Sequence, residues 1–147
     1  MNENNIVEEL KKALKSGDKI KVSVLRMLIS DLKNKKINDR IKELSEDQVL
    51  GIMRKRMKMH KESIGLFKEA GREDLVGKEE QEAGVLQEYM PEEMSEKETK
   101  RIVSAVIEEI DAKTMKDMGR VMKEVQERSS GRADGKIVSR IVKDILT

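Results

Sequence analysis

Apolar side chains recur along this chain at intervals of three and four residues, which is the period of an amphipathic α-helix. No segment shows the alternation of apolar and polar positions that marks a half-buried strand. The residue types agree with the spacing, because Lys, Glu, Leu, Met and Arg favour helices and the chain contains one proline. The sequence therefore predicts an all-α protein.

A distinctive turn separates the first two predicted helices. The first helix runs from about Asn4 to Ser16, and Gly17 after it suits the left-handed backbone that often ends a helix. Asp18 then offers an oxygen that can cap the next helix. This second helix carries a dense apolar stripe from Ile20 to Leu32 and runs into lysines within residues 33–36. We expect so apolar a helix to lie at the centre of its domain.

Two further helices are predicted before the single proline. Ser45 and Gln48 form a capping box, in which each side chain accepts a hydrogen bond from the other residue's backbone N–H. The third helix starts there and ends at Gly71. The fourth starts at about Arg72 and ends at Pro91, which lacks the N–H that a continuing helix needs.

After the proline the pattern restarts in three shorter helices, each with its own capping residue. The caps are Ser95 with Glu98, Thr114 with Asp117, and Asp134. We therefore predict two domains. Residues 1–92 form an N-terminal helical domain of four longer helices packed as hairpins, and residues 93–147 form a small three-helix C-terminal bundle.

Composition excludes several classes of function. The chain has no cysteine, so disulfides, thiolate metal sites and thiol catalysis are excluded, and a single histidine leaves little other metal chemistry. No run of apolar residues approaches the length of a membrane span, and the N-terminal residues do not resemble a secretory signal. We expect a soluble, cytoplasmic protein with no membrane association.

Charge is unevenly distributed along the chain. The formal net charge is +2, but residues 1–60 carry +6, residues 61–112 carry −8 and residues 113–147 carry +4. Two basic segments thus flank an acidic one. Such a distribution permits a surface that binds a polyanion, although charged runs on helical proteins are most often plain solvated surface.

Few side chains are candidates for catalysis or metal binding. His60 lies on the apolar side of the third helix, where helical spacing places no nucleophile or paired acid beside it, so packing is favoured over general-base catalysis. The carboxylates of Glu79, Glu80 and Glu82 can in principle bind a divalent cation. No EF-hand-like loop is present, however, and a solvated helix face is favoured. We predict no catalytic residue, no metal and no cofactor.

The segment from Gly131 to Lys136 is the most specific local feature. Its two glycines permit a tight turn at a helix start, where backbone N–H groups and the helix dipole favour an anion, and Arg132 and Lys136 add two cations. The same residues also suit an ordinary turn between helices, and Asp134 competes for the same N–H groups. Phosphate binding and a plain structural turn both remain open.

Basic side chains on two helices extend this feature. Lys116, Arg120 and Lys123 recur at intervals of four and three along one side of the sixth helix, and Arg140 follows on the seventh. Because aromatic residues are almost absent, single-stranded bases would gain little stacking, and the expected partner is structured RNA. The predicted RNA-binding residues are Lys116, Arg120, Lys123, Gly131, Arg132, Lys136 and Arg140.

Five separated blocks of sequence together resemble the YqeY-like family of the GatB/YqeY superfamily. They are residues 17–28, 67–76, 86–91, 116–122 and the glycine-flanked segment 131–136. Met90 stands where the family often has Leu. The resemblance spans nearly the whole chain and implies an all-helical protein of two parts. It also implies that the C-terminal part is similar to the tail domain of GatB in the glutamine-dependent tRNA amidotransferase, a domain that grips the tRNA body.

The resemblance extends to individual positions in the C-terminal part. Gly119, Val121 and Met122 match the tail's motif at positions that it implies are used for packing. The positions that it implies at the RNA-facing turn are Gly131, Arg132, Ala133 and Lys136.

Three functional hypotheses follow. The leading one is a non-catalytic accessory protein that binds tRNA or another structured RNA, either alone or within a tRNA-processing or amidotransferase complex. The alternative is a helical protein-interaction module whose charged faces keep it in solution. The third, a carbon–nitrogen ligase with glutamine as amido donor, is suggested by the family association. It is disfavoured because the sequence shows no cysteine nucleophile, no Ser/Lys/Ser constellation and no ATP cradle.

Overall fold

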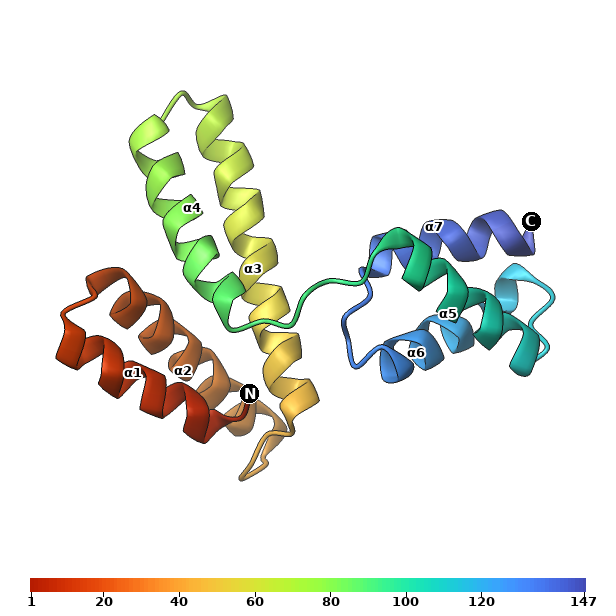
Figure 1. Ribbon diagram of the computed structural model, residues 1–147, viewed down its shortest axis with the longest axis horizontal. Helices are drawn as coiled ribbons and strands as arrows, with labels where there is room; N and C mark the ends of the chain where they lie inside the picture. The colour runs from red at the N-terminus through yellow and green to blue at the C-terminus, as the bar shows by residue number, and fades with distance from the viewer. The chain divides into compact units, whose positions relative to one another are not determined.

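The structure is a computed structural model that describes residues 1–147. It contains seven α-helices and one short 3-10 helix, with no strand, so the predicted all-α class is confirmed. The chain forms two compact units, Met1–Met90 and Pro91–Thr147 (Figure 1). None of the helices combines the length and the uninterrupted apolar run that crossing a membrane requires.

Four helices make up the N-terminal unit. They are α1 (Glu3–Ser16), α2 (Lys19–Asp39), α3 (Glu46–Glu69) and α4 (Glu73–Glu88). Figure 1 shows α1 and α2 as one antiparallel hairpin and α3 and α4 as a second. Helix α2 joins the two hairpins, because it packs against α1 as well as against α3 and α4.

The core of this unit is aliphatic and is centred on α2, as the dense apolar stripe predicted. Leu25 and Leu28 of α2 are almost wholly buried. They pack with Ile6 from α1, with Met53 from α3 and with Leu86 from α4, all of which are equally enclosed. Burial of each such side chain contributes about 1.5–3 kcal/mol relative to leaving it exposed to water.

The helix ends form where the capping residues predict them. Gly17 adopts the left-handed backbone after α1, with φ 74°. The capping box at the start of α3 is complete, because the Ser45 hydroxyl accepts from the Gln48 N–H at 3.1 Å and the Gln48 side chain accepts from the Ser45 N–H at 2.9 Å. Gly71, with φ 69°, reverses the chain between α3 and α4. Local sequence therefore determines where each hairpin turns.

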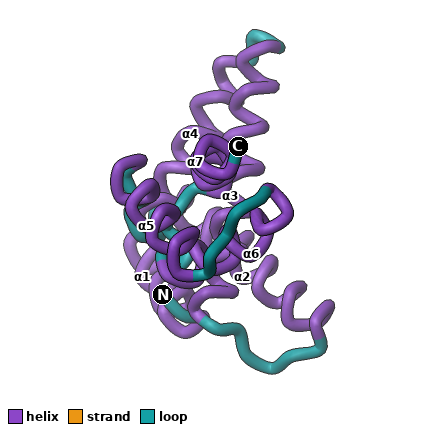
Figure 2. The backbone as a smooth tube through the Cα atoms, turned by 90° about the vertical axis from the view of Figure 1, so that its right-hand side faces the viewer, coloured by secondary structure: helices purple, strands orange, loops and turns teal.

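The C-terminal unit is a bundle of three helices with a short 3-10 element. Its elements are α5 (Glu96–Glu109), η1 (Met115–Asp117), α6 (Met118–Arg128) and α7 (Gly135–Leu146). Each of the three α-helices packs against the other two. Figure 2 shows the chain as helices joined by loops throughout. The bundle core is built almost entirely from valines, among them Val103, Val121 and Val138, each fully buried.

The start of α6 differs from the sequence expectation. The capping box of Thr114 and Asp117 is present, but it opens the 3-10 turn η1, and α6 begins only at Met118. A 3-10 turn has about three residues per turn, so it shifts the side chains before α6 out of register with the α-helical stripe behind them. Met115 is consequently 37% exposed, whereas Met118 and Met122 are half-buried against the core.

Truncating the centre of the α2 stripe should destabilise the N-terminal unit. We expect Leu25→Ala to lower the free energy of unfolding by about 2–5 kcal/mol, because it leaves a cavity in an enclosed aliphatic core. The chain has no Trp and one tyrosine, Tyr89, which belongs to this unit. Urea unfolding followed by Tyr89 fluorescence therefore reports on the N-terminal unit. In the control Leu66→Ala, at a side chain that is 65% exposed, the change should stay within about 0.5 kcal/mol, and equal losses in both variants would contradict the expectation.

The carboxyl of Asp117 should titrate at an unusually low pH. It accepts hydrogen bonds from the N–H groups of Lys113 at 3.0 Å and Thr114 at 3.4 Å, and these bonds hold its pKa below the ordinary 3.8, with the charge of Arg120 adding to the effect. A pKa depressed in the folded state means that the bonds stabilise the fold above the ordinary pKa and lose that effect as the pH falls through the depressed value. NMR titration of the Asp117 carboxyl carbon measures this pKa directly. Wild type and Asp117→Asn should differ in stability at pH 6 and converge in strong acid, and a pH-independent difference would refute the role.

Candidate functional site

Two of the basic residues predicted on the sixth helix lie on one side of α6. Successive residues of an α-helix are turned by about 100°, which places Arg120 and Lys123 on the side of α6 away from the buried Val121 and Val125. Lys116 lies in the turn that leads into this helix, and all three basic side chains are exposed.

These three cations differ in what they contact. The Arg120 guanidinium lies 3.4 Å from the Asp117 carboxylate and donates to the carbonyl of Ile110 at 3.4 Å. Lys116 and Lys123 form no side-chain hydrogen bond and no ion pair. The arginine is therefore part of the connection between α5 and α6, whereas the two lysines are accessible to an anion.

The glycine-flanked segment is a tight turn in which several backbone N–H groups already donate hydrogen bonds. Ser130 and Gly131 both adopt left-handed backbone, with φ 50° and 72°. The N–H groups of Ser130, Gly131 and Arg132 donate to carbonyls of residues 126–129 at 2.9–3.3 Å, which closes the end of α6. The Asp134 carboxylate then caps α7 by accepting from the Lys136 N–H at 2.8 Å. An anion at this turn would meet the Lys136 side chain, and the Lys136 N–H would be available only by displacing the Asp134 carboxylate.

Arg132 and Arg140 are both tied to the segment before α5. The Arg132 Nε donates to the carbonyl of Glu92 at 2.9 Å, and the Arg132 carbonyl accepts from the Met94 N–H at 3.1 Å. Arg140 of α7 forms an ion pair with Glu96 at the start of α5. Lys136 is exposed and its ammonium group has no ion-pair partner.

The predicted residues therefore fall into two classes. Arg120, Arg132 and Arg140 contact other parts of the bundle, whereas Lys116, Lys123 and Lys136 have no acidic partner. Lys116 precedes α6, Lys123 lies within it and Lys136 follows it. The helix between the first and the last of these lysines is roughly 16 Å long at 1.5 Å per residue. RNA contacts at these positions stay predictions.

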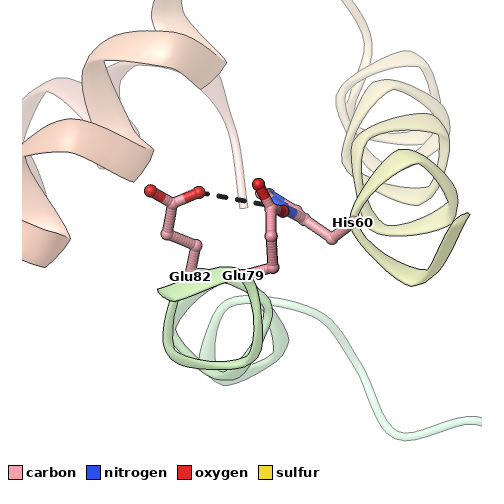
Figure 3. A group of neighbouring side chains, drawn as sticks. All are labelled: His60, Glu79 and Glu82. Carbon is pink, nitrogen blue, oxygen red and sulfur yellow. Dashed lines mark hydrogen bonds and ion pairs between the residues drawn. The ribbon is translucent and has the colours of Figure 1, made fainter. Parts of the chain in front are cut away.

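A second group of polar side chains converges in the N-terminal unit, where the sequence predicted only packing. His60 of α3 is 5% exposed, and its Nδ1 lies 2.6 Å from a carboxylate oxygen of Glu79 on α4 and 3.8 Å from one of Glu82. Figure 3 shows the three side chains pointing toward one another from the two helices. His60 is buried on the apolar side of α3, as expected, and the acids beside it come from α4, where spacing within α3 does not reach.

The sequence does contain a signal for this group. Spacing within one helix cannot reveal it, because the acids lie on α4 and the histidine on α3. The two helices form a hairpin that turns at Gly71, and His60 and Glu82 are each eleven positions from that residue. Neighbouring Glu80 points elsewhere, since it is exposed and its carboxylate lies 3.8 Å from Lys68. Pairing residues at equal distances from the turn would have indicated Glu82, and Glu79 lies three residues before it on the same face of α4.

Comparison with known proteins finds relatives among fungal mitochondrial proteins. The chain is 36% identical over 83 residues to Altered inheritance of mitochondria protein 41, mitochondrial, of Vanderwaltozyma polyspora, which is 56% of this chain and 45% of that protein. The protein of the same name from Eremothecium gossypii is 37% identical over 86 residues, 58% of this chain and 47% of that protein. The chain thus matches somewhat less than half the length of these relatives.

The names of these relatives correct the expected cytoplasmic location. The relatives from Vanderwaltozyma polyspora, Eremothecium gossypii and Kluyveromyces lactis are all named as mitochondrial proteins. The prediction was wrong because it rested on the lack of a membrane span, of a secretory-signal pattern and of cysteine. Those features suit any reducing aqueous compartment and do not distinguish one such compartment from another.

The match to a family model covers almost the whole chain. Residues 3–146 match the model of the family described as Yqey-like protein. This span includes all seven α-helices and both compact units. The chain therefore belongs to the YqeY-like family, as the five sequence blocks predicted.

Proposed function

We propose that this chain is a non-catalytic accessory protein that binds tRNA through its C-terminal unit. The observation that carries the proposal is the set of three exposed lysines without acidic partners, Lys116, Lys123 and Lys136, in the part of the chain that resembles the tRNA-gripping tail domain. Family membership supports the same direction without specifying a ligand.

Unpaired lysines are suited to phosphate binding for an energetic reason. A lysine that forms no ion pair neutralises a phosphate without first breaking a contact within the protein, and each such neutralisation releases counterions from the nucleic acid. The exposed pairs made by Arg120 and Arg140 are weak, about 0–1 kcal/mol each for a surface pair. These two arginines can therefore exchange their carboxylates for phosphates as secondary contacts.

The choice of folded RNA follows from the lack of aromatic residues. The chain has no Trp, and its single Phe and single Tyr, Phe67 and Tyr89, both belong to the N-terminal unit. The C-terminal unit therefore has no ring on which an unpaired base can stack, and stacking is the usual source of affinity for single strands. A folded RNA such as tRNA exposes its sugar-phosphate backbone, and proteins recognise it mainly through phosphate contacts and shape.

One observation favours the protein-interaction alternative. Apolar side chains are exposed along the α1–α2 hairpin, including Leu14 at 49% and Ile20 and Met27 at 37% each. They lie along or beside a shallow groove lined by residues of both helices. Exposed apolar patches on otherwise charged proteins are typical of docking surfaces. This surface belongs to the other unit and is compatible with RNA binding by the C-terminal one.

Removing the three unpaired lysines should weaken tRNA binding and its dependence on salt. We expect the Lys116→Ala, Lys123→Ala, Lys136→Ala variant to bind deacylated tRNA at least ten-fold more weakly at low salt. The slope of log K against log salt should shrink by about 2–3, at roughly 0.7–0.9 per phosphate contact. Filter binding of the full chain at several KCl concentrations measures both quantities.

The matched control removes three exposed lysines from the same unit. This control is the triple variant Lys97→Ala, Lys100→Ala, Lys113→Ala. It changes the net charge equally but keeps Lys116, Lys123 and Lys136. It should bind tRNA within about two-fold of wild type. The proposal fails if the two triple variants bind alike, or if wild type does not bind tRNA at low salt. Retention of a protein partner after RNase treatment, with no tRNA affinity, would select the interaction module instead.

A further inference from the structure

The group formed by His60, Glu79 and Glu82 lies between α3 and α4, in the unit that carries none of the residues of the RNA proposal. One ligand atom from each of the three side chains lies within 4.8 Å of the others. His60 is 5% exposed and Glu82 is 7% exposed, so water reaches the imidazole and one of the two carboxylates poorly. Figure 3 shows Glu79 and Glu82 rising side by side from α4, with the His60 ring reaching toward them from α3.

The protein alone does not satisfy this group. The Nδ1 of His60 can carry only one hydrogen, and at 2.6 Å that hydrogen is shared with Glu79. The Glu82 carboxylate accepts no hydrogen bond, and the same Nδ1 at 3.8 Å is its only ion-pair partner. No Lys or Arg nitrogen comes within ion-pair distance of Glu79 or Glu82. A buried carboxylate without a donor or a cation is costly, so the arrangement favours the arrival of a positive charge.

The donor set selects the kind of cation. Imidazole nitrogen suits Zn²⁺ and the neighbouring transition metals, whereas Mg²⁺ and Ca²⁺ prefer oxygen ligands alone. Zinc bound at about 2.0–2.2 Å by one nitrogen and two oxygens in tetrahedral geometry needs ligand atoms roughly 3.3 Å apart. The two His–Glu separations of 2.6 and 3.8 Å lie on either side of that value, and all three ligand atoms lie within 4.8 Å of one another, so side-chain rotation has to bring the carboxylates to their final positions.

We infer that His60, Glu79 and Glu82 bind a divalent transition-metal ion of the zinc type. The ligands are Nδ1 of His60 and one oxygen from each carboxylate, and water completes the coordination. Only an unprotonated Nδ1 coordinates, so its hydrogen leaves to solvent. The bound ring is neutral with its hydrogen on Nε2, and a ring that held its single hydrogen on Nδ1 takes that hydrogen up on Nε2 from solvent. The ion joins α3 to α4 midway along their hairpin and replaces the missing cation beside Glu82. The inference is independent of RNA binding.

The single histidine makes the test unusually direct. Full-length protein without an affinity tag is stripped with a chelator and titrated with Zn²⁺ by calorimetry, while the ring nitrogens are followed by ¹⁵N NMR. Because His60 is the only histidine, the spectrum contains one imidazole. We expect one Zn²⁺ per chain and a change in the Nδ1 resonance, with the hydrogen on Nε2 in the bound form. Mg²⁺ at the same concentration should leave both resonances unchanged.

A matched pair of substitutions on α4 distinguishes the site from the surrounding acidic surface. Glu82→Gln preserves shape and removes the buried charge, and it should weaken Zn²⁺ binding at least ten-fold. Glu80→Gln removes an exposed charge two residues away, and it should bind within two-fold of wild type. Circular dichroism confirms that each variant is folded.

The inference is overturned if wild type takes up no stoichiometric Zn²⁺. It is equally overturned if Nε2 responds in place of Nδ1, or if the two glutamine variants bind alike. The NMR measurement on wild type decides the matter even where Glu82→Gln does not fold.

Discussion

Burial of the aliphatic stripe of α2 is the interaction on which the N-terminal unit depends. This helix makes substantial contacts with the other three helices, and it contributes Val24, Leu25, Leu28 and Leu32 to a core that contains no fully buried aromatic ring. Aliphatic burial is strong but non-directional, since it scales with the apolar area removed from water. The α2 stripe can therefore hold two hairpins together without specifying the register in which they pack.

Directional polar contacts supply that register. Arg56 of α3 donates to both carboxylate oxygens of Asp31 on α2, at 2.6 and 2.8 Å, and this fork permits only one geometry. The close contact between His60 and Glu79 plays the same part between α3 and α4. In the C-terminal unit, whose core is mostly valine, the Arg132 contact with the Glu92 carbonyl fixes the segment that leads into α5. An aromatic-poor protein thus relies on a few half-buried polar contacts for its specificity.

This division explains what could be predicted from the sequence and what could not. Helix boundaries depend on contacts three or four residues apart, so Gly17, the Ser45 and Ser95 boxes and Pro91 indicate them correctly. The α-helical period also identifies the α2 stripe. The polar contacts that set the register join residues 19 to 40 positions apart, as His60 to Glu79 and Arg132 to Glu92 do. No local pattern encodes such pairs, and for that reason the sequence favours plain solvated surface at the two converging acids.

The two units also place their charges in opposite environments. On α6, on α7 and in the turn between them, arginines are used for internal contacts, because a planar guanidinium group makes several directed hydrogen bonds. The flexible and strongly hydrated lysines remain in solvent. A count of basic residues therefore overstates the surface that is available to a polyanion. Between α3 and α4, two carboxylates share one imidazole where water has little access, and solvent cannot offset the imbalance. Unpaired charge at the surface makes a ligand-binding face whose affinity depends on salt. Unpaired charge inside a hairpin favours a compact counter-ion, because dissolved salt does not screen it there.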